Sequence, residues 1–208
     1  MTVYKDYGYA SENRNHIHKY VLKPLLKTVG DKTDRIILDL GCGNGWLVNY
    51  LIEQGYDAYG TDASVSGIEI GKRKNKNKFF LQDLTRDGLP DELSAIPFNT
   101  IISTEVIEHL YAPGIYLDLC KKILLTNGGG ELILTTPYHG YLKNVVLSVS
   151  GKMDKHFTVL RDGGHIKFWS RKTLTAVLSE KGFTSTQFTG CGRLPLLWKS
   201  MMISSFIH

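Results

Sequence analysis

The chain has 208 residues, of which 42% are hydrophobic and 22% are charged, and its formal net charge is +5. This composition is typical of a globular protein and excludes collagen-like, low-complexity and intrinsically disordered chains. No apolar run approaches the ~18 residues that cross a bilayer, and the polar first residues do not resemble a signal peptide. We therefore expect one domain over residues 1–208.

The cysteines, Cys42, Cys120 and Cys191, are odd in number and far apart in the sequence. Because no C-x-x-C spacing occurs, the sequence predicts neither a disulfide framework nor a zinc pair. The reducing cytoplasm is the simplest location for such a chain.

The first part of the chain, residues 1–30, is expected to be a helical segment. Apolar residues recur at helical spacing from residue 14 to residue 29, including Ile17, Val21 and Leu25. An apolar run over residues 35–40 then leads into a glycine-rich loop, as expected of a buried parallel strand. The next helix covers residues 46–54 and ends at Gly55.

Strands and helices alternate through the middle of the chain. Strands are predicted over residues 57–61, 79–82, 99–103 and 131–136, with helices over 64–74 and 115–125. This alternation favours parallel strands joined by right-handed crossovers. After a helix over 171–181, strands at 183–189 and 198–207 flank a short link, which favours an antiparallel hairpin. The pattern predicts an α/β fold.

A glycine-rich loop, D-L-G-C-G-N-G, runs from Asp39 to Gly45 between the first strand and the next helix. Glycines there let the backbone approach a ligand closely, and the helix presents free N–H groups. Asp62 ends the following strand and lies ~20 residues further on, where dinucleotide folds place the acid that binds ribose. The dinucleotide fingerprint G-x-G-x-x-G itself is absent, because Gly45 comes one position early.

The spacing D-x-G-C-G-x-G resembles the first motif of class I S-adenosylmethionine-dependent methyltransferases, and the resemblance covers residues 36–207. It implies a Rossmann-like, seven-stranded, mostly parallel sheet with helices on both faces and an antiparallel last strand. It also implies S-adenosylmethionine as cofactor, with Asp62 on the ribose, Asp83 and the next N–H on the adenine, and the end of the fourth strand beside the methionine. The cofactor residues that it implies are Asp39, Gly41, Cys42, Gly43, Asp62, Ala63, Asp83, Leu84, Thr104 and Glu105.

A second motif, E-V-I-E-H, follows the fourth strand directly. In a helical turn Glu105, Glu108 and His109 share one face. The motif resembles that of ubiquinone-biosynthesis O-methyltransferases and of small-RNA 2′-O-methyltransferases, where a later histidine completes a magnesium or manganese site. The resemblance implies Mg²⁺ or another divalent cation on Glu105, Glu108, His109 and His165. The alternative is a metal-free cleft, in which His109, His139 or His165 acts as general base.

The segment over residues 138–170 is long and rich in glycine, aromatic and basic residues, as expected of an acceptor-side insert or lid. Three interpretations stay open: a lid helix, a helix packed on the domain, and a membrane-contacting patch over 138–160 with Lys143, Lys152 and Lys155. Near the N-terminus, Tyr4, Tyr7 and Tyr9 are expected to fold over the cofactor site.

The expected reaction is O-methylation of a small-molecule hydroxyl on a quinone-, phenol- or sugar-like acceptor. One alternative is an RNA 2′-O-methyltransferase, although no RNA-binding motif appears and nucleic acid is not the expected partner. The other is a non-catalytic module that binds S-adenosylmethionine.

Overall fold

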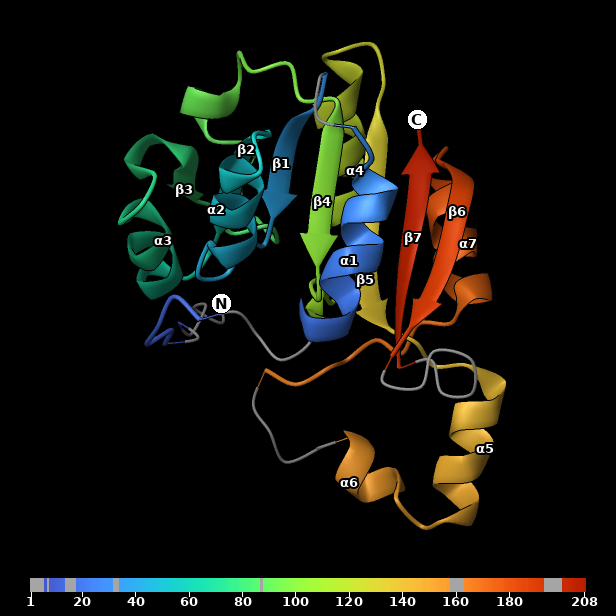
Figure 1. Ribbon diagram of the computed structural model, residues 1–208. Helices are drawn as coiled ribbons and strands as arrows, with labels where there is room; N and C mark the ends of the chain where they lie inside the picture. Colours follow the sequence, from blue (N-terminus) through green and yellow to red (C-terminus); the bar gives the residue numbers. More distant parts are fainter. Residues whose placement is uncertain are drawn as a thin grey trace.

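The computed structural model describes residues 6, 8–13, 18–31, 34–86, 88–157, 163–192 and 200–208. Its centre is a seven-stranded sheet in the order β3-β2-β1-β4-β5-β7-β6 (Figure 1). The strands are β1 (Ile36–Leu40), β2 (Asp57–Asp62), β3 (Phe79–Leu81), β4 (Thr100–Thr104), β5 (Glu131–Pro137), β6 (Thr184–Cys191) and β7 (Met201–Ile207). The predicted Rossmann-like sheet is confirmed.

The first five strands pair in parallel, and β7 runs antiparallel to both of its neighbours. The predicted final hairpin is therefore confirmed, with β7 inserted between β5 and β6. Since residues 201–207 form this strand, they are part of the sheet.

Helices cover both faces of the sheet, as expected. On one face lie α1 (His18–Val29), α2 (Trp46–Glu53) and α3 (Val65–Lys72), and on the other lie α4 (Pro113–Leu125) and α7 (Arg171–Glu180). Successive strand residues point to opposite faces, so Ile37 packs with Val21 and Leu25 of α1, whereas Leu38 packs with Leu117 and Leu174 on the opposite side. Each face thus has its own apolar core. The predicted start of α1, residues 14–17, lies outside the described residues.

Serine caps fix the first turns of two helices. The Ser64 hydroxyl accepts a hydrogen bond from the Gly67 N–H at the start of α3. Ser170 and Thr173 form a capping box at the start of α7. Short 3₁₀ turns complete the fold: η1 (Lys76–Lys78), η2 (Asp91–Leu93) and η3 (Ile107–His109).

The insert forms two short helices, α5 (Tyr141–Val149) and α6 (Met153–Phe157), beyond the carboxyl end of β5 (Figure 1). No helix in the described part of the chain is long and apolar enough to cross a membrane. Because β1, β2, β4 and β5 all end at this edge, the loops that follow them and the insert surround one region. Ligands of open α/β sheets bind at this edge.

Candidate active site

The glycine loop is held against the end of β2. The N–H groups of Gly41 and Cys42 both donate to the Thr61 carbonyl oxygen, at 2.8 and 2.9 Å. Gly41, Gly43 and Gly45 have φ values of 82°, 56° and 72°, which disfavour any other residue. A side chain at Gly41 would also collide with Val106. The loop therefore leaves backbone, rather than side chains, facing this edge.

Asp62 lies directly beside that loop, as the sequence predicted. Its Oδ2 accepts from the Gly43 N–H and its Oδ1 from the Ser64 N–H, both at 2.8 Å. Burial raises the pKa of Asp62, although these backbone N–H groups oppose the rise. Each oxygen has a second lone pair for an incoming hydroxyl group, and Ala63 follows at the strand end.

Asp39 is fully buried, and neither of its carboxylate oxygens has a hydrogen-bond partner among the described residues. Burial, with a further contribution from Asp62, raises its pKa to about 8. A buried carboxylate without a partner is costly. The ammonium group of S-adenosylmethionine is the kind of partner that Asp39 lacks, so this residue fits the expected cofactor.

The N-terminal segment covers the glycine loop. Asp6 accepts hydrogen bonds from the Ser64 hydroxyl at 2.5 Å and from the Ser66 N–H at 3.0 Å, which ties the segment to the start of α3. The Tyr9 hydroxyl lies against Gly43, since a Cβ built there would come within 2.7 Å of it. Tyr9 thus lies where expected, and Tyr4 and Tyr7 fall outside the described residues.

The turn after β3 carries Asp83 and the buried Leu84. Asp83 Oδ1 accepts from the Thr85 N–H and hydroxyl at 2.9 and 2.6 Å, and its Oδ2 accepts from Arg86 Nε at 2.9 Å. The Gln82 N–H donates to the Asp62 carbonyl oxygen. The turn therefore lies next to Asp62, but the Asp83 carboxylate is held mainly within its own turn.

The expected helical face after β4 is wrong. Glu105, which follows Thr104, has φ 58° and is the one non-glycine residue with positive φ in the described part of the chain. Because this left-handed backbone conformation cannot belong to a right-handed helix, Glu105 is excluded from the turn, and the 3₁₀ turn covers Ile107–His109 only. The Glu105 side chain accepts a hydrogen bond from the Thr135 hydroxyl at 3.2 Å.

Glu108, His109 and His165 nevertheless come together, with ligand atoms all within 4.8 Å of one another. Glu105 lies outside this group, which therefore has three of the four ligands that the resemblance implied. The N–H groups of Ile166 and Lys167 donate to the Glu108 carbonyl oxygen and hold the His165 segment in place. Glu108 is fully buried: its Oε2 accepts from the Thr136 hydroxyl, and its carboxyl lies against that of Glu105. Burial raises the pKa of both acids, and the neighbouring Glu108 raises that of Glu105 further.

His139 is not a member of that group and packs against the insert. Its ring centroid is 5.8 Å from that of His156 and 5.1 Å from that of Phe168. Burial and the nearby Lys143 lower its pKa to about 4. Sequence reasoning missed Lys143 and His156 as neighbours of His139, because His139 precedes α5 and no helical spacing relates the three residues.

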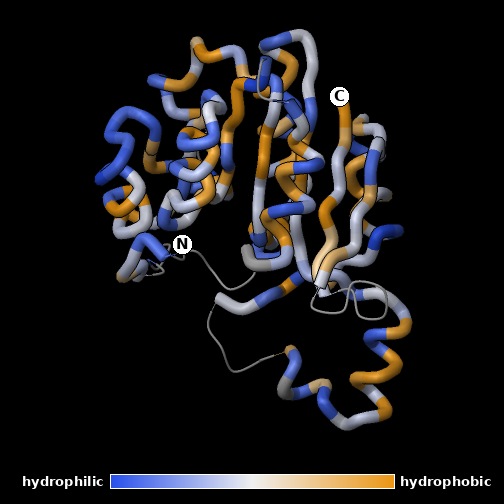
Figure 2. The backbone as a smooth tube through the Cα atoms, viewed as in Figure 1, coloured by the Kyte–Doolittle hydropathy of each residue, from blue (hydrophilic) through white to orange (hydrophobic). Residues whose placement is uncertain are grey.

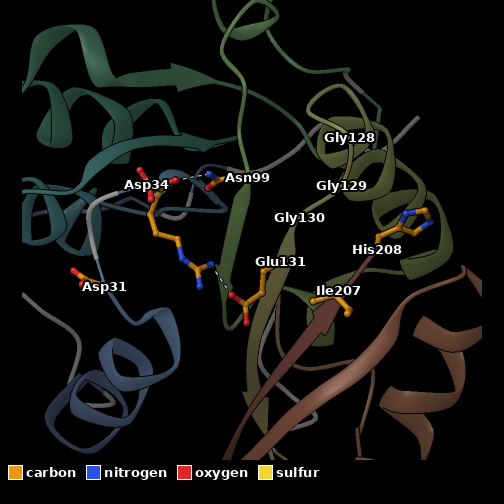
Figure 3. Close-up of a pocket in the computed structure, with 10 residues that line it drawn as sticks. Asp31, Asp34, Asn99, Gly128, Gly129, Gly130, Glu131, Ile207 and His208 are labelled. Carbon is orange, nitrogen blue, oxygen red and sulfur yellow. Dashed lines mark hydrogen bonds and ion pairs between the residues drawn. The ribbon is translucent and has the colours of Figure 1, made fainter.

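A cavity of about 580 Å³ opens at the opposite, amino edge of the sheet (Figure 3). Its wall includes Asp31, Asn99, His208 and the ion pair of Arg35 with Glu131 at 2.5 Å. Arg35 also donates to Thr100, so this pair joins the start of β1 to β4 and β5. The residues there hold strands together, and none belongs to the predicted site.

Comparison with known proteins agrees with the geometry. A family model described as a methyltransferase domain matches residues 11–187. An uncharacterized methyltransferase of Geobacillus sp. is 27% identical over 180 residues, covering 86% of this chain and 83% of the relative. A ubiquinone biosynthesis O-methyltransferase of Pelagibacter ubique is 29% identical over 118 residues, covering 55% of this chain and 47% of that enzyme. The chain thus aligns with about half the length of that second relative.

Solved structures show the same fold. The magnesium protoporphyrin IX methyltransferase of Synechocystis, crystallised with S-adenosylhomocysteine, has a TM-score of 0.62 at 18% identity, covering 90% of this chain and 80% of that one. The methyltransferase domain of a bacterial Hen1 protein has a TM-score of 0.58 at 24% identity, covering 89% and 95%. Since the family model spans most of the chain, the chain belongs to the methyltransferase domain family and is an S-adenosylmethionine-dependent methyltransferase.

Proposed function

We propose that this methyltransferase transfers a methyl group to the oxygen of a small-molecule hydroxyl, on a quinone-, phenol- or sugar-like acceptor. The observation that carries the proposal is the convergence of Glu108, His109 and His165 after β4, at the same edge as the glycine loop. Such a group can bind and deprotonate a hydroxyl. The similarity to ubiquinone biosynthesis O-methyltransferases supports oxygen as the methylated atom.

In this proposal the cofactor lies across the carboxyl ends of β1, β2 and β4. Asp62 binds the ribose hydroxyls, Asp39 pairs with the ammonium group, and the backbone of Gly41, Cys42 and Gly43 supports the amino-acid part. Ala63, Asp83 and Leu84 border the adenine, whereas Thr104 and Glu105 border the methionine chain. When bound, S-adenosylmethionine supplies a methyl group on a sulfonium that is already a good leaving group.

The residues of the chain then have to place the hydroxyl in line and take its proton. His109 and His165 are exposed at the site, with ring centroids 4.8 Å apart. In the metal-free cleft, where no cation occupies their ring nitrogens, these two imidazoles are the groups placed to accept the proton as the new C–O bond forms. His139, whose pKa is about 4, is a weak base, and we assign it no proton transfer. Orientation supplies much of the remaining rate.

We further propose that Glu108, His109 and His165 hold a divalent cation such as Mg²⁺, next to Glu105. Mixed carboxylate and imidazole ligands suit several divalent metals. The fit rests on the buried acids: Glu108 is fully buried beside the carboxyl of Glu105, and a divalent cation would compensate their charge. When bound, the cation would lower the pKa of the acceptor hydroxyl. The competing interpretation, a metal-free cleft, predicts that chelation has no effect.

A partner surface is proposed for α5. Leu142, Val145, Val146 and Val149 lie at i, i+3, i+4 and i+7 and are 37–85% exposed. Figure 2 shows the corresponding apolar segments along α5, away from the sheet. We propose that this face touches a membrane surface, with the exposed Lys152 beside it. Lys143, which we had expected to serve that surface, is buried instead, and the structure does not describe the Lys155 side chain.

Vesicle co-sedimentation tests the surface. Val149→Glu should reduce binding to vesicles that contain anionic lipid. The matched change Val65→Glu, at an equally apolar exposed position on α3, should not. Equal binding by both variants and the unchanged protein would refute the membrane contact.

Radiolabelled methyl transfer tests the proposed reaction. The acceptors offered are catechols, phenols, sugars and short RNAs with a free 3′-terminal ribose, each with Mg²⁺ or with EDTA. We expect methyl transfer to a small hydroxyl compound. His165→Ala should reduce this transfer at least about tenfold, and His208→Ala should leave it unaffected. Transfer to RNA alone would establish the alternative substrate. Tight cofactor binding without any transfer would indicate a non-catalytic module.

A further inference from the structure

A basic cluster lies behind the proposed acceptor site, where the insert returns to the sheet. Lys143 of α5 is 8% exposed and His139, just after β5, is 7% exposed. His156 of α6 completes the cluster from the solvent side. These three basic residues therefore come from three successive elements.

Aromatic rings line the same space. Phe157 stacks on His139 with centroids 6.0 Å apart, and Phe168 packs edge-on against both rings, at 5.1 Å from His139 and 4.8 Å from Phe157. Phe168 is 47% exposed. The exposed Phe168 ring thus gives a flat organic molecule a binding surface next to the cluster.

Lys143 carries the positive charge of this cluster at neutral pH, because the pKa of His139 is only about 4. The Lys143 ammonium donates to the Tyr138 carbonyl oxygen at 3.2 Å, and it forms no ion pair with a carboxylate of the described residues. Burial lowers its pKa to about 8. Burial and then Lys143 lower the pKa values of both His139 and His156.

The start of α5 adds to this positive potential. No acidic residue occupies its first turn, and no side chain caps it. Helix N-termini favour anions, and a buried cation at such an end is doubly unfavourable. Because a leucine or methionine would fill the place of Lys143 at lower cost, the fold alone does not account for a lysine here.

The cluster also adjoins the reacting groups. The His139 N–H donates to the Trp169 carbonyl oxygen at 2.9 Å, on the same segment as His165, which is a member of the group with Glu108 and His109. A molecule whose hydroxyl lies at His165 could therefore extend toward Lys143.

We propose that the acceptor carries an anionic oxygen group, a carboxylate or a phosphate, which Lys143 binds together with His139 and His156. This inference rests on the proposed function for the place of the reacting hydroxyl, but anion binding by the cluster does not depend on methyl transfer. Charge-assisted hydrogen bonds to the anion satisfy the free Lys143 donors. The rings of Phe157 and Phe168 bind the carbon skeleton.

Histidine ring NMR of the full chain, saturated with S-adenosylhomocysteine, tests the anion site. The probes are benzoate, its neutral analogue benzamide, and inorganic phosphate. We expect benzoate or phosphate, and not benzamide, to shift the His139 and His156 signals saturably, with the stronger of the two identifying the group. Lys143→Met should weaken that binding about tenfold, the value of one charge-assisted hydrogen bond. Lys152→Met, an exposed lysine three residues beyond α5, is the matched control.

The proposal is overturned if neither anion shifts these signals, or if Lys143→Met binds as tightly as the unchanged protein. A second measurement compares methyl transfer to 3,4-dihydroxybenzoate and to 4-methylcatechol. The site is supported if KM is lower for the carboxylate acceptor and if Lys143→Met removes this difference while keeping kcat for the neutral catechol. Equal KM values of the unchanged protein for the two acceptors contradict the site. Benzoate binding without any methyl transfer would contradict the proposed O-methylation and leave the anion site standing.

Discussion

The glycine loop and the insert border the same edge of the sheet, but they are held in different ways. The N–H groups of the loop donate to the Thr61 carbonyl oxygen and to the Asp62 carboxylate, and its glycine positions leave no room for larger residues. The insert consists of two short helices, and α5 leaves Leu142 and Val149 exposed at 63% and 85%. A fixed backbone suits an unvarying cofactor, whereas a side-chain surface on short helices can change with the acceptor. Substitutions of the loop glycines should therefore cost both stability and cofactor binding, whereas changes in the insert should leave cofactor binding intact.

The largest effect is expected from Gly45→Ala. At φ 72° an added Cβ would lie 2.5 Å from a Phe79 ring carbon and 2.8 Å from the Gly71 Cα. We expect the free energy of unfolding to fall by about 2–4 kcal/mol, with loss of cofactor binding. Chemical denaturation measures the change. Gly88→Ala, where a Cβ meets nothing within 4 Å, is the control, and an equal loss there would contradict the account.

Removing a proposed metal ligand should come next. His165→Ala should weaken Mn²⁺ binding, followed by electron paramagnetic resonance, by about 10- to 100-fold. His208→Ala, at the far edge of the sheet, should leave it unchanged. If the unchanged protein binds no Mn²⁺ at millimolar concentration, the metal proposal is wrong and the metal-free cleft stands.

Asp39→Asn should separate stability from cofactor binding. The pKa of Asp39 is about 8 in the fold against an ordinary 3.8, so the protein loses stability from this group as pH rises from about 4 to 8. The variant lacks this loss and should be more stable at pH 8 by about 1–2 kcal/mol, while binding S-adenosylmethionine more weakly. Denaturation curves of both proteins at pH 5 and pH 8 measure the effect. If the stability difference between Asp39→Asn and the unchanged protein is the same at both pH values, the raised pKa of Asp39 is refuted.

The smallest effect is expected in the insert. Since the pKa of Lys143 is lowered from 10.5 to about 8, its charge destabilises the fold below pH 8 and ceases to do so above 10.5. Lys143→Met should raise stability at pH 7 by about 1–2 kcal/mol, with a gain that shrinks toward pH 10. S-adenosylhomocysteine binding should not change. A loss of stability at pH 7 would show that Lys143 is paired.

These expectations show what local sequence specifies. The glycine loop, the strand before it and Asp62 were predictable because their residues are close together in the sequence and follow the pattern of one strand–loop–helix unit. The left-handed backbone at Glu105 was not, since E-V-I-E-H has helical spacing and glutamate favours helices. The basic cluster was missed because its formation depends on how α6 folds back onto the end of β5, which no periodicity records.

The most direct test is calorimetric titration with S-adenosylhomocysteine. The account predicts micromolar binding by the unchanged protein and about 100-fold weaker binding by Asp62→Ala, which loses two hydrogen bonds to ribose hydroxyls. Asp57→Ala, at the opposite end of β2, should bind normally. If the unchanged protein does not bind, or if Asp62→Ala binds as tightly, the cofactor does not lie at this edge as described.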